Sequence, residues 1–102
     1  MIVTPVARET VAVAGTAVGL TSTAIKPTVK TYDVEYAEIQ VQTAQVRVTF
    51  EGTAPVAATT GEVWLPGTTK RVWGIGNLLA IRFIRESSTS ASLEVTYWGR
   101  KS

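Results

Sequence analysis

The sequence predicts an all-β domain, an antiparallel β-sandwich or jelly-roll-like barrel of seven to eight short strands. The chain has 16 threonines and 14 valines among its 102 residues, and β-branched side chains favour strands over helices. Short segments of alternating apolar and polar residues recur along the chain, and turn-forming residues separate them about every ten residues. No segment shows the periodicity of an amphipathic helix.

The length of 102 residues is typical of one domain. We expect residues 1–102 to form a single β-sandwich, with residues 1–8 as a flexible N-terminal arm. The first strand is predicted from Glu9 to Ala14, where two valines share one face. A Gly-Thr turn follows, and a short second strand is predicted over Ala17–Leu20.

The middle of the chain contains the clearest strand pattern. Residues 21–36 are predicted to form a long irregular connection, because Lys26-Pro27 disfavours a helix. Apolar and polar residues then alternate over 37–42, which is typical of a half-buried strand. After Thr43 the alternation reverses and continues to Phe50, so the two faces exchange. We expect a tight hairpin near Thr43, with a β-bulge as the alternative.

Four further segments complete the predicted strands. Glu62–Leu65 and Thr69–Gly74 flank a Pro-Gly-Thr turn and are predicted to form a hairpin. Leu78–Arg85 is almost continuously apolar, which indicates a central strand covered on both faces. Residues 91–98 alternate strictly and predict the last strand, and residues 99–102 are expected to be a frayed basic end.

The sequence contains neither cysteine nor histidine, which excludes several kinds of chemistry. Disulfides, thiol nucleophiles, Cys/His zinc sites and imidazole acid–base catalysis all need these residues. The glutamates fall on polar faces or at strand ends, where solvated charges are ordinary. Asp33 and Glu35 place two acids in one loop, which is a weak pattern for calcium. We therefore expect no enzyme, no catalytic residue, no metal and no cofactor.

Charge and hydropathy argue against nucleic acid and membranes as partners. The formal net charge is only +2, and no apolar run approaches the roughly 20 residues that cross a bilayer. Residues 1–9 lack the basic region and apolar core of a signal peptide, so we expect synthesis in the cytoplasm. Only 18% of the residues are charged, which favours a surface partly covered by a partner over a surface that is merely rich in threonine.

Three tryptophans and two neighbouring cations are the candidate interface residues: Trp64, Trp73, Trp98, Lys70 and Arg71. Trp64 and Trp73 lie on opposite arms of the predicted hairpin, where they would pack on each other as a cross-strand pair. Trp98 has the polar parity of its strand and is expected to be exposed. Tryptophan also anchors protein interfaces, and aromatic side chains beside cations can stack on sugars or on bases.

Two arginines interrupt the predicted central strand. A charge buried there must be paired. Glu94 lies on the neighbouring predicted strand, so we expect it to pair with Arg82 or Arg85.

The second half of the chain resembles small β-rich virion proteins of tailed bacteriophages, over roughly residues 37–98. The segments that carry the resemblance are VRVTFEGTAP at 46–55, TTG at 59–61, LPG at 65–67, GNL at 76–78, IRFI at 81–84 and ASLEVTY at 91–97.

The resemblance implies a capsid decoration (cement) protein on the virion surface. Such a protein binds the major capsid protein, stabilises the head and is often a homotrimer at threefold or quasi-threefold positions. Many copies on a lattice gain avidity without any single strong contact. The N-terminal arm could then become ordered on the particle.

Two other functions remain open. The first is a carbohydrate- or receptor-binding β-sandwich module of a phage tail or fibre, with Trp98 and Tyr97 as stacking platforms. The second is a single-strand nucleic-acid binder that uses Lys70, Arg71 and Trp73, although the small net charge disfavours it.

Overall fold

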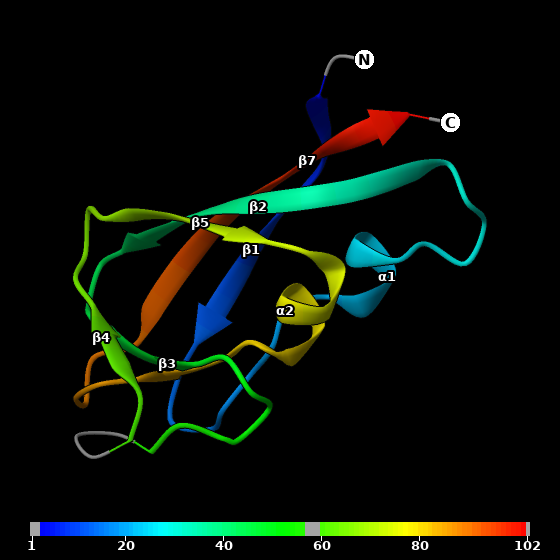
Figure 1. Cartoon of the computed structure of the whole chain (residues 1–102). Coiled ribbons are helices and arrows are strands. Elements are labelled where there is room, and N and C mark those ends of the chain that lie inside the picture. Colours follow the sequence, from blue (N-terminus) through cyan, green and yellow to red (C-terminus); the bar gives the residue numbers. More distant parts are fainter. Residues whose placement is uncertain (1–2, 57–59, 102) are drawn as a thin grey trace.

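The computed structural model describes residues 3–56 and 60–101 and confirms the predicted all-β sandwich (Figure 1). Two antiparallel sheets pack against each other. The first sheet has the strand order β1-β7-β2-β5 and the second has the order β4-β3-β6. The strands of the first sheet are β1 (Thr4–Val13), β2 (Tyr32–Gln42), β5 (Thr69–Trp73) and β7 (Ala91–Lys101). Those of the second are β3 (Val46–Thr49), β4 (Glu62–Trp64) and β6 (Arg82–Arg85).

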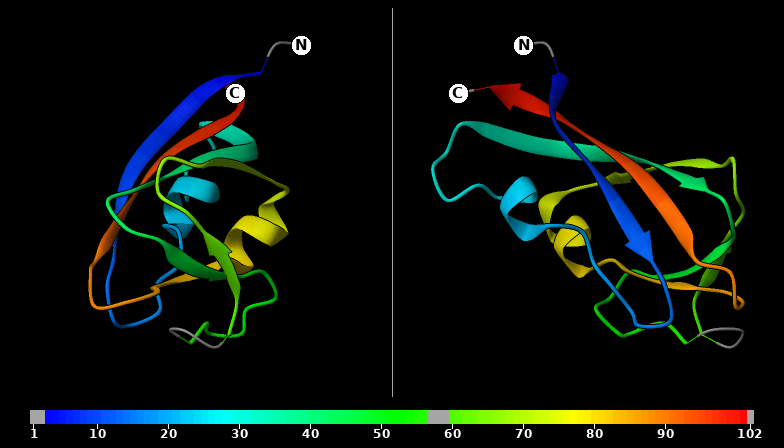
Figure 2. Two further views of the ribbon diagram at one scale, coloured as in Figure 1. Left: turned by 90° about the vertical axis from the view of Figure 1, so that its left-hand side faces the viewer. Right: turned by 180° about the vertical axis from the view of Figure 1, so that it is seen from behind.

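Two short helices complete the layer under the first sheet. They are α1 (Ser22–Ile25) and α2 (Ile75–Ala80), which contact each other. Figure 2 shows them beside the second sheet, on the same side of the first sheet. Because α2 also contacts β2 and β5, the helices cover the part of the first sheet that the three shorter strands do not reach.

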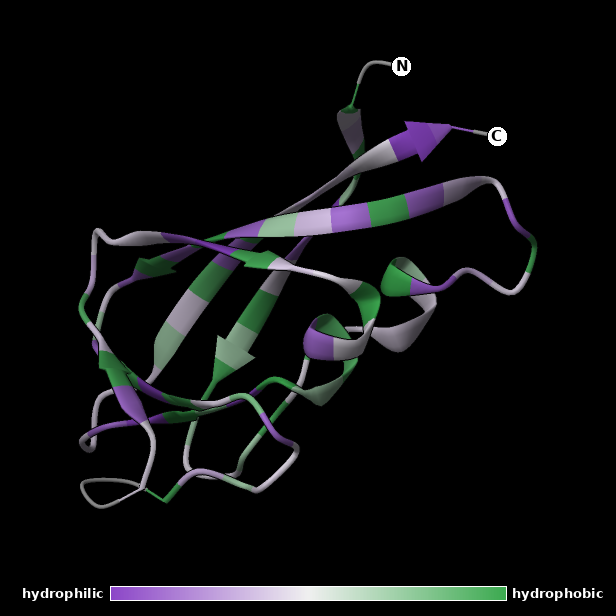
Figure 3. Cartoon of the chain, viewed as in Figure 1, coloured by the Kyte–Doolittle hydropathy of each residue, from purple (hydrophilic) through white to green (hydrophobic). Residues whose placement is uncertain are grey.

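The core lies between the two layers and follows the strand period of two. On β7, every second side chain from Ala91 to Tyr97 is buried, and the residues between them are partly exposed. On β2, the buried side chains are Val34, Ala37, Ile39 and Val41. Figure 3 shows the resulting alternation of hydropathy along both strands. The opposite layer contributes Val46, Val48, Trp64, Leu78, Ile81 and Phe83.

Both ends of the chain are more extended than the sequence predicts. Strand β1 begins at Thr4 instead of Glu9, and Thr4 lies opposite Gly99 of β7. Most of the segment predicted as an arm is therefore strand, while residues 1 and 2 lie outside the described part. The predicted frayed end is also strand up to Lys101, which lies opposite Tyr32. The reason is that β7 offers hydrogen-bonding partners to strands on both of its sides.

The predicted hairpin at Thr43 is wrong, and so is the β-bulge alternative. Strands β2 and β3 belong to different sheets, so the reversal of alternation marks a crossing between layers. Thr43 has a positive φ of 77°, and the N–H of Ala44 donates to the carbonyl of Gln42 at 2.9 Å. This tight reversal directs the following apolar residues into the core from the opposite sheet.

The second predicted hairpin is also wrong, because β4 pairs with β3 and β5 pairs with β2. The turn between β4 and β5 carries the chain back to the first sheet. There the N–H of Gly67 donates to the carbonyl of Val41 at 2.7 Å, and the N–H of Val41 donates to the backbone carbonyl of Thr68 at 3.0 Å. The Pro-Gly turn therefore attaches to β2 and does not join two paired strands.

The predicted central strand over 78–85 is wrong in both form and place. Its first three residues end helix α2, and its last four, Arg82–Arg85, form β6 at an edge of the second sheet. Leu78 is buried while Leu79 is partly exposed, so the apolar run serves a helix face and then a strand. Asn77 donates its side-chain N–H to the carbonyl of Trp73 at 2.8 Å, which holds the start of α2 against the end of β5.

The irregular region before β2 also differs in detail from the expectation. The predicted strand over 17–20 is reduced to an isolated bridge between Val18 and Phe83. A single helical turn, α1, ends at Ile25, directly before Lys26-Pro27. Proline therefore limits the helix to one turn but does not prevent it.

The expected pairing of Glu94 with Arg82 or Arg85 is wrong, because Glu94 lies on the outer face of the other sheet. Its carboxylate accepts a hydrogen bond from Arg8 at 3.2 Å. Arg82 donates to the backbone carbonyls of Leu79 and Ile81 at 3.0 and 2.9 Å. Arg85 donates to the hydroxyl of Ser90 at 3.3 Å.

We expect Gly99→Ala to lower the free energy of unfolding by about 3 kcal/mol or more. An added Cβ would lie 1.8 Å from the backbone carbonyl oxygen of Asp33, so β2 and β7 would have to separate. Urea unfolding provides the measurement. Gly76→Ala is the control: nothing lies within 4 Å of a Cβ at this position of α2, and alanine should stabilise the helix by about 0.5–1 kcal/mol. Equal stability of the two variants would contradict the described approach of Gly99 to Asp33.

Candidate functional site

The outer face of the first sheet carries three aromatic side chains, one on each of three neighbouring strands. Trp98 of β7 lies opposite Tyr36 of β2, and Tyr36 lies opposite Trp73 of β5. Residues opposite each other on adjacent strands have Cβ atoms about 5 Å apart. The strand register therefore joins Trp98, Tyr36 and Trp73 into a continuous aromatic row.

The rings of the aromatic row stack on one another. The centroids of Tyr36 and Trp98 are 6.1 Å apart and their planes are nearly parallel, at 5°. Those of Tyr36 and Trp73 are 4.3 Å apart, with planes inclined by 32°. Trp73 ends the row on edge strand β5 and is 56% exposed. It is therefore the ring that offers most surface to a partner.

Trp98 is less accessible than its polar parity suggests. The residue is only partly exposed, and its indole Nε1 is buried without a hydrogen-bond partner among the described residues. The neighbour in register on its other side is Pro5 of β1. Trp98 therefore presents little surface to a partner. Trp73, and not Trp98, is the exposed aromatic side chain of the row.

A charged pair lies directly beside the aromatic row. Arg71 lies over Tyr36, with its guanidinium carbon 5.4 Å from the ring centroid, a distance typical of a cation–π contact. The same guanidinium donates to the carboxylate of Glu38 at 3.2 Å. Arg71 is thus held between an aromatic ring and an acid on the neighbouring strand.

An open groove of about 500 Å³ lies at the side of β5, and we call it the edge groove. It contains aromatic, apolar and charged side chains from both layers of the sandwich. Its lining residues are Phe50, Glu62, Trp64, Lys70, Arg71, Val72, Trp73 and Asn77. Both β4 and β5 are edge strands of their sheets, so the groove lies between two free edges.

Trp64 forms the floor of the edge groove and belongs to the core. It is only 2% exposed, and its ring packs against Phe50 and Phe83, each with centroids 6.0 Å away. The expected Trp64–Trp73 pair is wrong because the two residues lie on different sheets. The ammonium of Lys70 lies 5.9 Å from the Trp64 centroid.

All five sequence-predicted interface residues border the edge groove or the aromatic row, but two participating aromatics were missed. Tyr36 falls in the region predicted as an irregular loop, and the alternation that ends at Phe50 places this residue on the apolar face of a strand. Extending the alternation of residues 37–42 backward would have placed Tyr36 on the same face as Glu38. The exposure of Phe50 has no comparable sequence signal, because it depends on where β3 ends.

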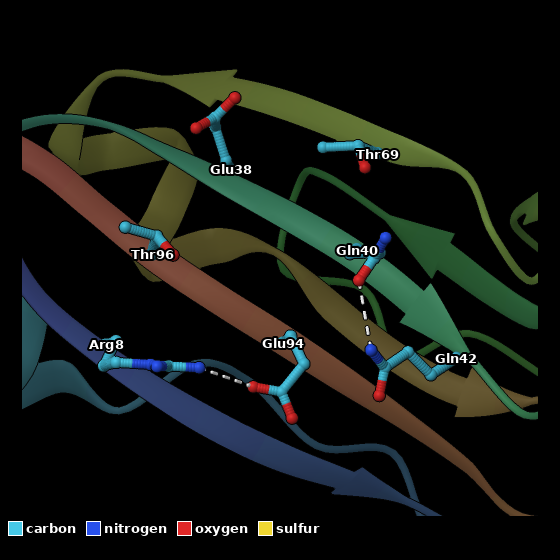
Figure 4. A pocket seen from close by; sticks show the side chains of 7 residues that line it. All are labelled: Arg8, Glu38, Gln40, Gln42, Thr69, Glu94 and Thr96. Carbon is cyan, nitrogen blue, oxygen red and sulfur yellow. Dashed lines mark hydrogen bonds and ion pairs between the residues drawn. The ribbon is translucent and has the colours of Figure 1, made fainter.

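A second, polar depression lies on the outer face of the first sheet, and we call it the polar hollow (Figure 4). It is open to solvent and has a volume of about 550 Å³. Side chains from all four strands of the sheet surround it: Arg8, Glu38, Gln40, Gln42, Thr69, Glu94 and Thr96. Gln42 donates its amide N–H to the carbonyl oxygen of Gln40 at 3.0 Å.

The acids that suggested calcium are engaged with cations. Asp33 pairs with Lys30 at 3.3 Å, and Glu35 pairs with Arg100 at 3.0 Å. Within residues 3–56 and 60–101, no three His, Cys, Asp or Glu residues are grouped so that they could hold a metal ion. No helix in the same residues is long and apolar enough to cross a membrane.

Tyr97 is fully buried, so the expectation that it serves as a stacking platform is wrong. Its hydroxyl donates a hydrogen bond to the carboxylate of Glu9. The same carboxylate accepts hydrogen bonds from the hydroxyl and backbone N–H of Thr21, at 2.6 and 3.1 Å. Burial, followed by the hydrogen bond to Glu9, raises the pKa of Tyr97 far above its ordinary value of 10.0. This network fastens the segment before α1 to the first sheet.

Comparison of the chain with known protein families, with curated proteins and with solved structures finds no match.

We expect Tyr97→Phe to lower the free energy of unfolding by about 2 kcal/mol near neutral pH, because the hydrogen bond to the charged carboxylate of Glu9 is lost. The folded wild type keeps a phenol proton that its unfolded chain releases above about pH 10. Its stability should therefore fall there by up to about 1.4 kcal/mol per pH unit through this group. The variant lacks the phenol hydroxyl, so the difference in the free energy of unfolding between the wild type and the variant should shrink above that pH. Urea unfolding of both proteins at several pH values measures the difference, and a deficit that stays constant would contradict the assignment.

Proposed function

We propose that this chain is a non-enzymatic structural protein of a tailed-phage virion. In this role it is a capsid decoration protein that binds the major capsid protein and stabilises the head. The sequence resemblance supports the class of protein. The observation that carries the docking role is the concentration of exposed apolar side chains around β4 and β5. These are Phe50, Val63, Leu65 and Trp73.

The edge groove has the composition of a protein interface. Aromatic residues are enriched in the centres of such interfaces, and charged and polar residues surround them. Here Phe50 and Trp73 are partly exposed and Trp64 forms the floor. Lys70 and Glu62 supply opposite charges at the margin. A protein surface with complementary apolar and charged groups would fit this groove.

The free edges of β4 and β5 offer a second kind of contact. Edge strands present unpaired backbone N–H and C=O groups, and a segment of a partner can pair with them. Backbone pairing would fix the orientation of the partner, and the groove would accept its side chains. Repeated over many copies, such modest contacts become strong through avidity.

A homotrimer is the oligomeric state that we propose for this role, because threefold positions of a shell present three equivalent docking sites. Three linked copies would bind far more tightly than one.

The edge groove also argues against nucleic acid as the partner. Its lining also contains an acid, Glu62, and Arg71 is already paired with Glu38.

The proposal predicts that Phe50→Ser and Leu65→Ser each weaken binding to capsid shells about tenfold, because each removes apolar area worth roughly 1.4 kcal/mol. Co-sedimentation with shells of the phage that encodes the protein provides the measurement. Light scattering after size-exclusion chromatography gives the oligomeric state. Leu65 does not pack in the core and is 56% exposed, so its variant should fold even if Phe50→Ser does not.

Val29→Ser is the matched control. Val29 is 76% exposed and belongs to the segment between α1 and β2. Figure 1 shows this segment at the opposite end of the molecule from β4. Its variant should bind as the wild type does. The proposal is rejected if the shells fail to retain the wild type, or if the Leu65 variant binds as tightly as the control.

A further inference from the structure

We propose that the outer face of the first sheet binds a neutral oligosaccharide. The sugar residues would occupy the polar hollow, and one of them would lie against Trp73 at the end of the aromatic row. This surface shares Trp73 with the edge groove, whereas neither Phe50 nor Leu65 lines the polar hollow. The inference goes beyond the proposed docking role and does not depend on it.

The aromatic row and the polar hollow form one continuous strip along the sheet. On β2, the outward side chains are Tyr36, Glu38, Gln40 and Gln42 in succession. Successive side chains on one face of a strand are about 7 Å apart. Tyr36 therefore belongs to the aromatic row, Glu38 lies beside that row, and Gln40 and Gln42 line the hollow. The strip is long enough for an extended chain of several sugar residues.

The chemistry of the hollow matches sugar hydroxyl groups, which both donate and accept hydrogen bonds. The glutamine amides supply donors and acceptors, the glutamates accept, and the guanidinium of Arg8 donates. Thr69 and Thr96 add hydroxyls that can do either. Bidentate contacts to neighbouring hydroxyls are possible because these side chains lie on adjacent strands.

The charge balance disfavours an anionic ligand. The lining of the hollow contains one arginine and two glutamates, and the arginine is already paired with Glu94 at 3.2 Å. A nucleic acid or a sulfated glycan would find no unpaired cation in this lining, because Arg8 is paired with Glu94 and the neighbouring Arg71 is paired with Glu38. A neutral sugar needs no such cation. The centre of the hollow also lacks the apolar side chains that a protein interface needs.

The aromatic row supplies the second half of a sugar site. The C–H face of a pyranose ring packs against an aromatic ring, while its hydroxyls bind polar groups at the margin. Trp73 is the exposed ring of the row. Its cross-strand partner is Tyr36 of β2, and Glu38 is the next outward residue on that strand. Arg71 is fixed between them by its contacts to Tyr36 and Glu38. Apolar and polar contacts are thus available side by side.

The surface is preorganised, which favours binding of a flexible ligand. Strands β2 and β7 are both interior strands of the sheet. The carboxylate of Glu94 is held by Arg8 and by the hydroxyl of Thr10, at 3.2 and 3.0 Å. Side chains that are already positioned lose little entropy when a ligand binds.

The test is a panel of neutral glucose-, mannose- and galactose-based oligosaccharides, immobilised and probed with the intact protein. We expect the wild type to bind at least one of them. The double variant Gln40→Ala/Gln42→Ala should bind at least tenfold more weakly. Both glutamines are exposed on the sheet surface, so the variant should fold normally. Gln45→Ala is the matched control, because Gln45 lies between β2 and β3, outside the hollow.

Salt dependence separates this site from an anion-binding surface. Binding of a neutral glycan should change little between low and high salt, whereas binding of a polyanion falls steeply. The inference is rejected if the wild type binds no neutral glycan, if it binds only acidic ones, or if the double variant binds as the control does. Retention of the double variant on capsid shells should match the wild type, so failure of the glycan site leaves the docking proposal standing.

Discussion

The long pairing of β7 with β2 fixes which side chains of the first sheet face the core and which face outward. The two strands are paired along nearly their whole lengths, with one register shift between Val34 and Tyr36. In this register Val95 and Tyr97 point into the core, and Trp98 points outward. A slip of one residue would exchange the two faces. Gly99 enforces the register locally, because the backbone of Asp33 occupies the space that any side chain would need.

The same register that builds the core also builds the outer surface. Because strands alternate, each buried pair between β2 and β7 has an outward pair beside it. Tyr36 and Trp98 form one such pair, and Gln40 and Glu94 form another. The aromatic row and the polar hollow are thus consequences of strand alignment. The exposed apolar residues near β4 lie elsewhere, on β4 itself and in the segments that follow β3 and β4.

The sandwich depends on the crossings of the chain between its two sheets. Thr43 and the turn before β5 each move the chain from one layer to the other. Every strand of the second sheet is short, so helices α1 and α2 must cover the remaining part of the first sheet. Ile25 and Leu78 are fully buried there and complete the core. This division leaves β4 and β5 as free edges on either side of one groove.

The local sequence was sufficient to predict the all-β class and the buried face of β7, because alternation along a strand is a local property that each strand carries in its own residues. It also identified Trp73 and Arg71 as surface candidates. It did not determine which strands pair, so both predicted hairpins failed, and it placed Leu78 in a strand although that residue ends up in a helix. The contact of Tyr36 with Trp73 and Trp98 follows from the strand register of the folded chain. The physical reason is that pairing depends on contacts between distant segments, and no local pattern records the register in which two such segments meet.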